Sequence, residues 1–193
     1  MGTFRYNQAL GCFVRCQKVS ASQAHFTMIL IDPAIQTRFG RVVRRRALAG
    51  FLAEASAAAR LAGDIPVLLT TDREIRRLNR EFRHKDKATD VLSFPALEPV
   101  NGQEAQAGDL AVSVETAERQ AAEAGHALFV ELQVLVLHGV LHLAGYDHER
   151  DSGQMARKEA TLRKRFGLGS GLIERSATAA RTRPAQRRGS RQS

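Results

Sequence analysis

Residues 134–148, VLVLHGVLHLAGYDH, place two histidines within an apolar run and a third histidine shortly after a glycine. The apolar residues of this run predict a buried helix. Each helical residue advances by about 100°, so His138 and His142 lie on one face, one turn apart. Gly145 predicts the end of this helix, because glycine readily adopts the left-handed conformation that reverses the chain. The reversal would bring His148 back toward the other two imidazoles.

Three imidazoles in this arrangement favour a metal site over hydrogen-bonded core histidines, which remain the alternative. The segment has few polar partners, and a buried, unpaired imidazole costs a few kcal/mol. A metal ion would use the lone pairs of His138, His142 and His148 and so remove that cost. Three nitrogen ligands leave one tetrahedral position for water, whose pKa Zn²⁺ lowers toward about 7. Zn²⁺ is therefore the expected ion, although imidazole also suits nickel, copper or iron.

The spacing H-x-x-x-H-x-x-G-x-x-H also coincides with that of metzincin proteases. In metzincins a glutamate directly after the first histidine is the general base. That position is Gly139 in this chain, and glycine has no side chain that can accept a proton. A metallopeptidase is therefore a disfavoured interpretation.

Hydrophobic periodicity along the rest of the chain predicts a single α+β domain. Short strands are expected at residues 28–31, 65–70, 91–94 and 109–114. Helices are expected at residues 36–61, after Thr71, and at 115–124, 128–144 and 151–166. The predicted architecture is a small mixed sheet of about four strands packed with about five helices.

Two local patterns make these expectations more specific. Thr71 and Glu74 have the spacing of a capping box, in which each side chain bonds the backbone amide of the other. Leu110, Val112 and Val114 alternate with smaller or polar residues, which predicts a strand buried on one face.

The two ends of the chain differ in composition from the predicted domain, residues 28–166. Residues 1–27 are expected to be an N-terminal extension that is non-native or disordered, with Met28 as the favoured start. A transit-like segment is the alternative, because this stretch contains no Asp or Glu. Residues 167–193 predict a basic disordered tail. Residues 174–193 hold six arginines and one acidic residue, so +5 of the net charge of +9 belongs to this tail.

Composition also constrains the compartment and the partners. Cys12 and Cys16 have no second pair of ligands nearby, so reduced thiols are expected rather than a zinc knuckle. No apolar run approaches the about 20 residues that span a bilayer. These features predict a cytoplasmic protein with no membrane partner. The domain itself is only mildly basic, so charge alone is a weak argument for nucleic acid.

Three separated motifs resemble the YbeY family of bacterial endoribonucleases. They are HGVLHLAGYDH at residues 138–148, LNREFRHKDKATDVLSFP at 78–95 and GDLAVS at 108–113. The resemblance covers roughly residues 28–166. It implies a metal-dependent, single-strand-specific endoribonuclease that acts in maturation of ribosomal RNA (the 3′ end of 16S rRNA) and in ribosome quality control, with the ribosome or ribosomal proteins as partners.

The same resemblance implies that His138, His142 and His148 hold the metal and that Arg83 has a catalytic role. Arg83 follows a predicted helix, beside a polar loop, and a planar guanidinium can bind phosphate with two hydrogen bonds. An exposed surface charge is the alternative for this residue. Asp90 and Asp109 are candidates for orienting a histidine, with helix or turn capping as the alternative.

In the hydrolytic hypothesis, the metal and Arg83 stabilise charge on the phosphoryl oxygens. Basic residues that could guide the RNA backbone are Arg41, Arg45, Arg76, Arg77, Arg80 and Lys85; a solvated helix face is the alternative. No residue is identified as the general base. A ribosome-associated RNA-binding assembly factor with a structural metal is the main alternative function.

Overall fold

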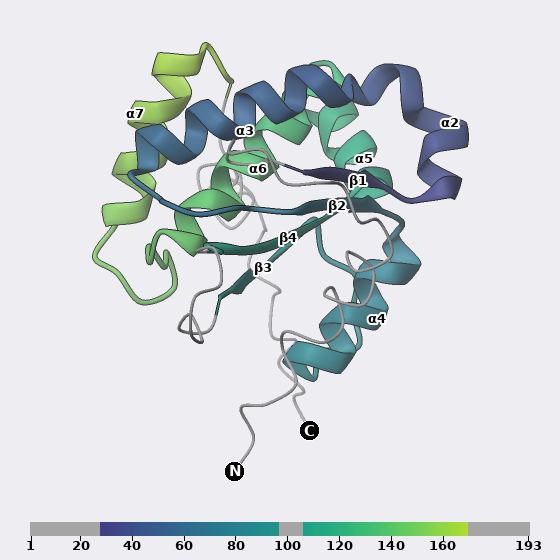
Figure 1. Ribbon diagram of the computed structural model, residues 1–193, viewed down its shortest axis with the longest axis horizontal. Helices are drawn as coiled ribbons and strands as arrows, with labels where there is room; N and C mark the ends of the chain where they lie inside the picture. Colours follow the sequence, from purple (N-terminus) through teal and green to yellow (C-terminus); the bar gives the residue numbers. More distant parts are fainter. Residues whose placement is uncertain (1–27, 97–105, 170–193) are drawn as a thin grey trace, which may run out of the picture.

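The computed structural model describes residues 28–96 and 106–169 of the 193-residue chain. Figure 1 shows a sheet with several helices on its upper side and one helix, α4, on its lower side. The predicted N-terminal extension with Cys12 and Cys16, and almost all of the predicted basic tail, lie outside the described residues.

The sheet has four strands in the order β1-β2-β4-β3. They are β1 (Ile29–Ile31), β2 (Val67–Thr70), β3 (Val91–Pro95) and β4 (Gly108–Ser113). The strands β1, β2 and β4 are parallel, and β3 is antiparallel to β4 at the edge of the sheet. The predicted α+β fold class and the small mixed sheet are therefore confirmed.

The described helices are α2 (Pro33–Val43), α3 (Arg45–Ala59), α4 (Asp72–Arg83), α5 (Val114–Ala124), α6 (Leu128–Leu143) and α7 (Gln154–Phe166). The prediction of one continuous helix over 36–61 is wrong, because the helix is interrupted at Arg44. This residue has φ 49° and ψ 54°, a left-handed conformation that breaks the ladder of helical hydrogen bonds. Its guanidinium lies 4.7 Å from the ring centroid of Phe129 on α6, a cation–π contact at the break.

Each face of the sheet has its own hydrophobic core. On the α6 face, side chains of β2 and β4 such as Val67, Leu110 and Val112 pack with residues of α2, α3, α6 and α7. On the α4 face the cluster is smaller and consists of Leu68, Ile75, Leu78, Phe82, Leu92, Phe94 and Ala111. The functional elements described below come from both faces.

The central strand β4 is buried along its whole length, so the prediction of a strand buried on one face is wrong. It lies between β2 and β3 and contacts both α4 and α6, which leaves neither face open to solvent. Ala111 joins the core on the α4 face, while Val114 begins α5. Alternation could not reveal this arrangement, because a small residue such as Ala111 is compatible with either a buried or an exposed position.

At the N-terminus of α4, only one of the two hydrogen bonds of the predicted capping box is formed. Thr71 Oγ1 accepts a hydrogen bond from the backbone N–H of Glu74 at 3.3 Å, as expected for an N-cap. The carboxylate of Glu74 instead pairs with Arg77 at 2.7 Å. The helix therefore begins where the sequence predicts, with the glutamate bonded along the helix rather than back to the cap.

The most deeply buried helix is α6, whose residues from Val134 to Leu141 are all buried. It contacts α3, α5, β3 and β4. Among the described residues, no single helix combines the length and hydropathy needed to cross a membrane; α5 and α6 meet these criteria only jointly, as a pair bent by 113°.

Candidate metal centre

His138 and His142 lie one turn apart near the C-terminal end of α6, as their spacing predicts. Their Nε2 atoms are 3.1 Å apart, and their ring centroids are separated by 4.7 Å. His138 is buried and His142 is half-buried. Two ring nitrogens therefore face a common position at the end of a rigid, well-packed helix.

Gly145 ends this helix and reverses the chain, which confirms its predicted role. Its φ is +88°, in the region that favours glycine. The N–H of Tyr146 donates to the carbonyl of Leu141 at 3.1 Å, and that of Gly145 to the carbonyl of His142 at 3.0 Å, the bond pattern of a Schellman motif. The returning segment carries His148, whose ring centroid lies 5.4 and 5.3 Å from those of the other two histidines.

The three imidazoles form a group that fits a metal ion. One nitrogen from each ring lies within 4.8 Å of the others. Burial, followed by the charges of His138 and His148, lowers the pKa of His142 from 6.5 to about 4, so this ring is neutral at pH 7 and offers a lone pair. Converging neutral imidazole nitrogens are a donor set that suits zinc and several other divalent transition metals.

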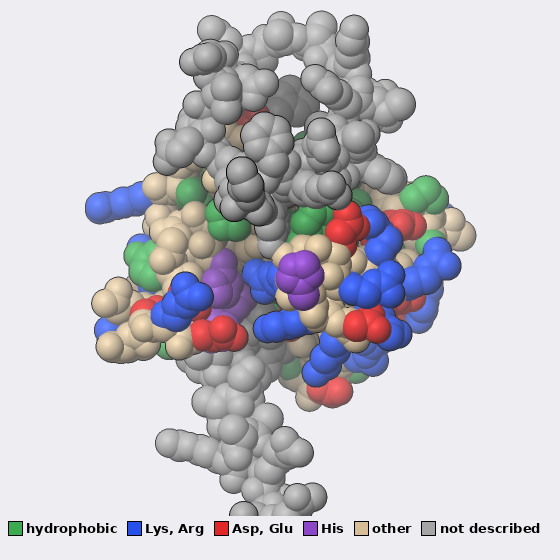
Figure 2. Space-filling model, turned by 90° about the horizontal axis from the view of Figure 1, so that it is seen from below, with side chains coloured by type: hydrophobic (Ala, Val, Ile, Leu, Met, Phe, Trp, Pro, Cys, Tyr) green, Lys and Arg blue, Asp and Glu red, His purple; other side chains and the backbone are tan. Residues whose placement is uncertain are grey.

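The histidine trio opens into a cavity of about 780 Å³ between the end of α6 and the end of α4. Its cationic lining residues are Arg83, Lys85, Lys87 and Arg150, and its acidic ones are Asp90, Asp147 and Glu149. Figure 2 shows histidine side chains on this face of the molecule with Lys and Arg side chains beside them. The cavity therefore brings the three clustered histidines together with groups that can bind an anion.

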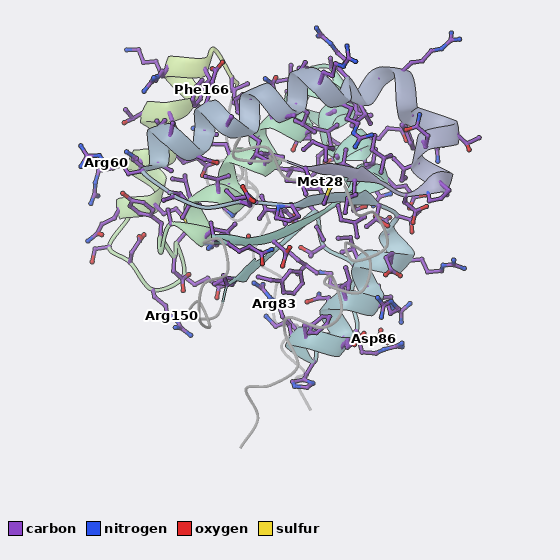
Figure 3. The ribbon with its side chains drawn as sticks, in the orientation of Figure 1. Met28, Arg60, Arg83, Asp86, Arg150 and Phe166 are labelled. Atoms are coloured by element: carbon purple, nitrogen blue, oxygen red, sulfur yellow. The ribbon has the colours of Figure 1, made fainter. Side chains whose placement is uncertain are left out.

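Arg83 is placed at this cavity by the end of α4. The helix stops at this residue, and His84 follows in a left-handed conformation with φ 57°. The Arg83 guanidinium donates to the backbone carbonyl of Ser93 on β3 at 3.4 Å. Figure 3 shows Arg83 below the sheet, on the same side as Arg150 from the loop after α6. The sequence interpretation of Arg83 as a helix-end residue beside a polar loop is confirmed.

The other basic residues singled out in the sequence fall into separate groups. Lys85 lines the cavity. Arg76 is paired with Asp86 at 2.8 Å, and Arg77 lies between two glutamates of its own helix. These two charges are already compensated and do not line the cavity. Arg41 and Arg45 belong to α2 and α3, which cover the opposite side of the sheet in Figure 1, so they are not part of the same surface.

Neither predicted aspartate orients a histidine. Asp90 accepts hydrogen bonds from the backbone N–H of Val91 at 2.8 Å and from Gln120 on α5 at 3.0 Å, so it has the alternative, structural role at the start of β3. Asp109 accepts a bond from Gln106 at 3.2 Å. Its position in β4 alternates with Leu110, so it faces the α4 side of the sheet.

Glu159, which sequence reasoning missed, is an acidic residue that does approach one of the clustered histidines. Its Oε2 lies 3.5 Å from Nδ1 of His138, and both side chains are almost fully buried. Glu159 shares the buried face of α7 with Met155 and Leu162. Glu159 follows Met155 by four residues and precedes Leu162 by three, so it lies on the same helix face as these two apolar residues. This spacing was the sequence signal that could have identified it.

Gly139, next to the first histidine, allows α6 to lie against the sheet. A Cβ at this position would lie 2.7 Å from Cδ2 of Leu110 and 3.4 Å from Oγ of Ser93. The Ser93 hydroxyl also donates to the Gly139 carbonyl at 3.4 Å. Close packing on β3 and β4 thus explains the glycine that stands where a metzincin has its general base.

Comparison with known proteins gives the family of this chain. The family described as Endoribonuclease YbeY matches residues 34–167. The chain belongs to the YbeY family. A YbeY relative from Koribacter versatilis is 51% identical over 145 residues, which cover 75% of this chain and 89% of the relative. One from Anaeromyxobacter dehalogenans is 50% identical over 140 residues, or 71% of this chain and 70% of the relative.

Among solved structures, the solution structure of TM1509 from Thermotoga maritima is 29% identical. The match covers 83% of this chain and 100% of that one, with a TM-score of 0.47. The span of the YbeY family match includes Arg83 and all three clustered histidines. The resemblance predicted from three short motifs is therefore confirmed at the level of the family.

Proposed function

We propose that this chain is a metal-dependent endoribonuclease that cleaves single-stranded RNA. The observation that supports this most is the convergence of His138, His142 and His148 beside a cavity that Arg83 also lines, in a chain of the YbeY family. From the same resemblance we propose ribosomal RNA, including the 3′ end of 16S rRNA, as the substrate, the ribosome as a partner and the cytoplasm as the location.

In this proposal the three histidines hold a divalent metal ion, for which Zn²⁺ is the first candidate. When bound, the ion supplies positive charge and lowers the pKa of water. Arg83 binds a nonbridging phosphoryl oxygen and stabilises the negative charge that develops there. Lys85 and Lys87 line the same cavity and attract the flanking phosphates. Within residues 28–96 and 106–169, the cavity lining holds no tryptophan or tyrosine and no phenylalanine besides Phe82, so backbone contacts rather than base stacking dominate binding.

We further propose that residues 28–166 form the domain that carries this activity and that the basic tail, residues 167–193, is not needed to bind the metal. His138 and His142 lie in α6 and His148 lies in the connection to α7, and the hydrogen bonds that end α7 extend no further than Gly169 among the described residues. A chain truncated after Gly167 should bind Zn²⁺ with the same stoichiometry as the full chain. Loss of metal on truncation would show that the tail contributes to the site.

The function is tested by cleavage of a single-stranded fragment from the 3′ end of 16S rRNA. Full-length wild type, His142→Ala and Arg83→Ala are compared with and without a chelator, and bound metal is measured in each preparation. Arg46→Ala is the control, because Arg46 is an exposed arginine on α3, away from the cavity. His142→Ala should lose both metal and cleavage.

Arg83→Ala should retain the metal but cleave about 100-fold more slowly, the usual cost of removing one donor to a developing oxyanion. Cleavage that is indifferent to both substitutions would indicate a contaminating nuclease and favour the alternative, an RNA-binding assembly factor with a structural metal. Hydrolysis of casein would instead favour a metallopeptidase, which Gly139 argues against.

A further inference from the structure

His138 has two ring nitrogens that face different neighbours. Its Nε2 faces Nε2 of His142, 3.1 Å away, toward the cavity. Its Nδ1 faces α7, where Oε2 of Glu159 lies at 3.5 Å. Only one nitrogen of a neutral imidazole carries a proton, so the neighbour of Nδ1 influences which nitrogen keeps its lone pair.

Glu159 occupies a position that its chemistry alone does not explain. The residue is 1% exposed and stands in the middle of α7, where it cannot cap the helix. Within residues 28–96 and 106–169, neither carboxylate oxygen of Glu159 nor Nδ1 of His138 has a hydrogen-bond partner that meets ordinary geometric limits. Burying a carboxylate without a close partner is strongly unfavourable, so an apolar residue would stabilise the metal-free fold better.

We propose that Glu159 is a positioning residue for the metal centre. Its carboxylate accepts the Nδ1–H of His138, which fixes the tautomer that leaves the Nε2 lone pair directed at the metal. The acceptor also raises the basicity of the ring, and its negative charge offsets part of the charge of an ion held by three neutral imidazoles. This inference rests on the metal site of the proposed function and adds a residue from α7 to it.

Packing explains how Glu159 could hold the ring in one orientation. Met155 and Leu162, on the same face of α7, are buried in the core that contains much of α6. The carboxylate is therefore carried by a helix whose position relative to α6 is fixed. The 3.5 Å separation from Nδ1 is longer than an ordinary N–H···O hydrogen bond, so a direct bond requires the two side chains to move closer together.

A matched control exists at the other end of α6. Glu131 is also fully buried, and its Oε2 lies 3.1 Å from Nε2 of His126. His126 is not one of the clustered histidines. Substitution of Glu131 therefore removes a buried carboxylate that also faces a histidine, but from α6 rather than α7 and away from the clustered histidines.

The test measures Zn²⁺ affinity of the full-length chain by competition with a chromophoric chelator, with no RNA present. The variants are Glu159→Gln, Glu159→Leu and the control Glu131→Gln. Thermal unfolding of each metal-free protein is measured in parallel. Glu159→Gln should weaken Zn²⁺ binding about 10- to 100-fold, the usual effect of losing such a partner, and Glu159→Leu at least as much.

The metal-free melting temperature separates positioning from simple structural support. Because the carboxylate is buried without a close partner, Glu159→Leu should melt no lower than wild type when metal is absent. Glu131→Gln should leave Zn²⁺ affinity unchanged. Should Glu159→Leu fail to fold, Glu159→Gln, which is nearly isosteric, still gives the answer.

Two results would overturn the inference. One is Zn²⁺ affinity in Glu159→Gln equal to that of wild type. The other is equal weakening by Glu159→Gln and Glu131→Gln, which would indicate a general effect of charge or stability. In both cases wild type still binds Zn²⁺ and cleaves RNA, so the proposed function survives; failure of wild type itself to bind any divalent metal would overturn both.

Discussion

The two faces of the sheet differ in how fully they are covered and in which functional groups they supply. On the α6 face a large core joins five helices to the strands, and two of the clustered histidines lie on α6. On the α4 face a smaller cluster lies beneath one helix, whose end carries the exposed Arg83. The well-packed face thus supplies the clustered histidines, and the thinly covered face supplies the Arg83 cation that lines the cavity beside them.

The largest effect expected from this comparison concerns a histidine on each end of α6. His142→Ala should raise the Kd for Zn²⁺ by about 200- to 300-fold, because each of three ligands contributes about a third of a binding free energy of order 10 kcal/mol. His126→Ala should leave the Kd unchanged, since His126 lies outside the cluster. Isothermal titration with Zn²⁺ measures the Kd of both variants. An equal loss of Zn²⁺ affinity in the two variants would contradict the distinction between the two ends of the helix.

A second prediction concerns Asp109 on the α4 face. Burial raises the pKa of Asp109 from 3.8 to about 6, so the folded protein binds this proton more tightly than the unfolded chain does. The corresponding stability is fully present below about pH 4 and is lost as the pH rises through about 6. Relative to wild type, Asp109→Asn should therefore become more stable by up to about 3 kcal/mol between pH 4 and pH 7.5.

Chemical denaturation of the metal-free protein at the two pH values checks this prediction for Asp109. Asp86→Asn serves as a control, because Asp86 is exposed and paired with Arg76, which lowers the pKa of its carboxyl. Asp86→Asn should show little pH dependence between pH 4 and pH 7.5, because the stability from a lowered carboxyl pKa is lost only as the pH falls below about 4. A difference between wild type and Asp109→Asn that is constant with pH would show that this carboxyl is well solvated at the edge of the α4 face.

A third prediction compares two helical glycines on the covered face. Gly139→Ala should destabilise the protein by about 1–2 kcal/mol, because the new methyl group overlaps Leu110 between α6 and the sheet. Gly50→Ala in α3 should stabilise it by about 0.5–1 kcal/mol, since nothing lies near its Cβ position and alanine is the better helix former. Thermal and urea unfolding measure both; a neutral Gly139→Ala would mean that α6 packs less tightly than described.

The histidine trio could be predicted from sequence because its determinants are local. The spacing of His138 and His142 follows from helix geometry, and the reversal follows from the conformational freedom of Gly145. Strand positions were predictable for the same reason, as runs of apolar residues bounded by polar ones. The predicted bounds of β1 to β4 are each within two residues of those observed.

What the sequence did not reveal depends on contacts between distant segments. In the sequence, Glu159 could not be distinguished from other helical glutamates, because only the packing of α7 on α6 brings its side chain to His138. The helix break at Arg44 is not marked in the sequence by a glycine or proline at that position. Asp90 and Asp109 lie in motifs shared with the family, but their neighbours are set by the pairing of β3 with β4.

The chain reversal at Gly145 leads into a short connection between α6 and α7 that carries the exposed His148. In the proposed metal-bound form, an ion shared by His148 and the histidines of α6 would hold this connection against α6. Removing the ion with EDTA should therefore accelerate amide hydrogen exchange first between Tyr146 and Gly153, while the interior of α6 keeps its protection. Metal binding and the ordering of the segment at one edge of the cavity would then occur together.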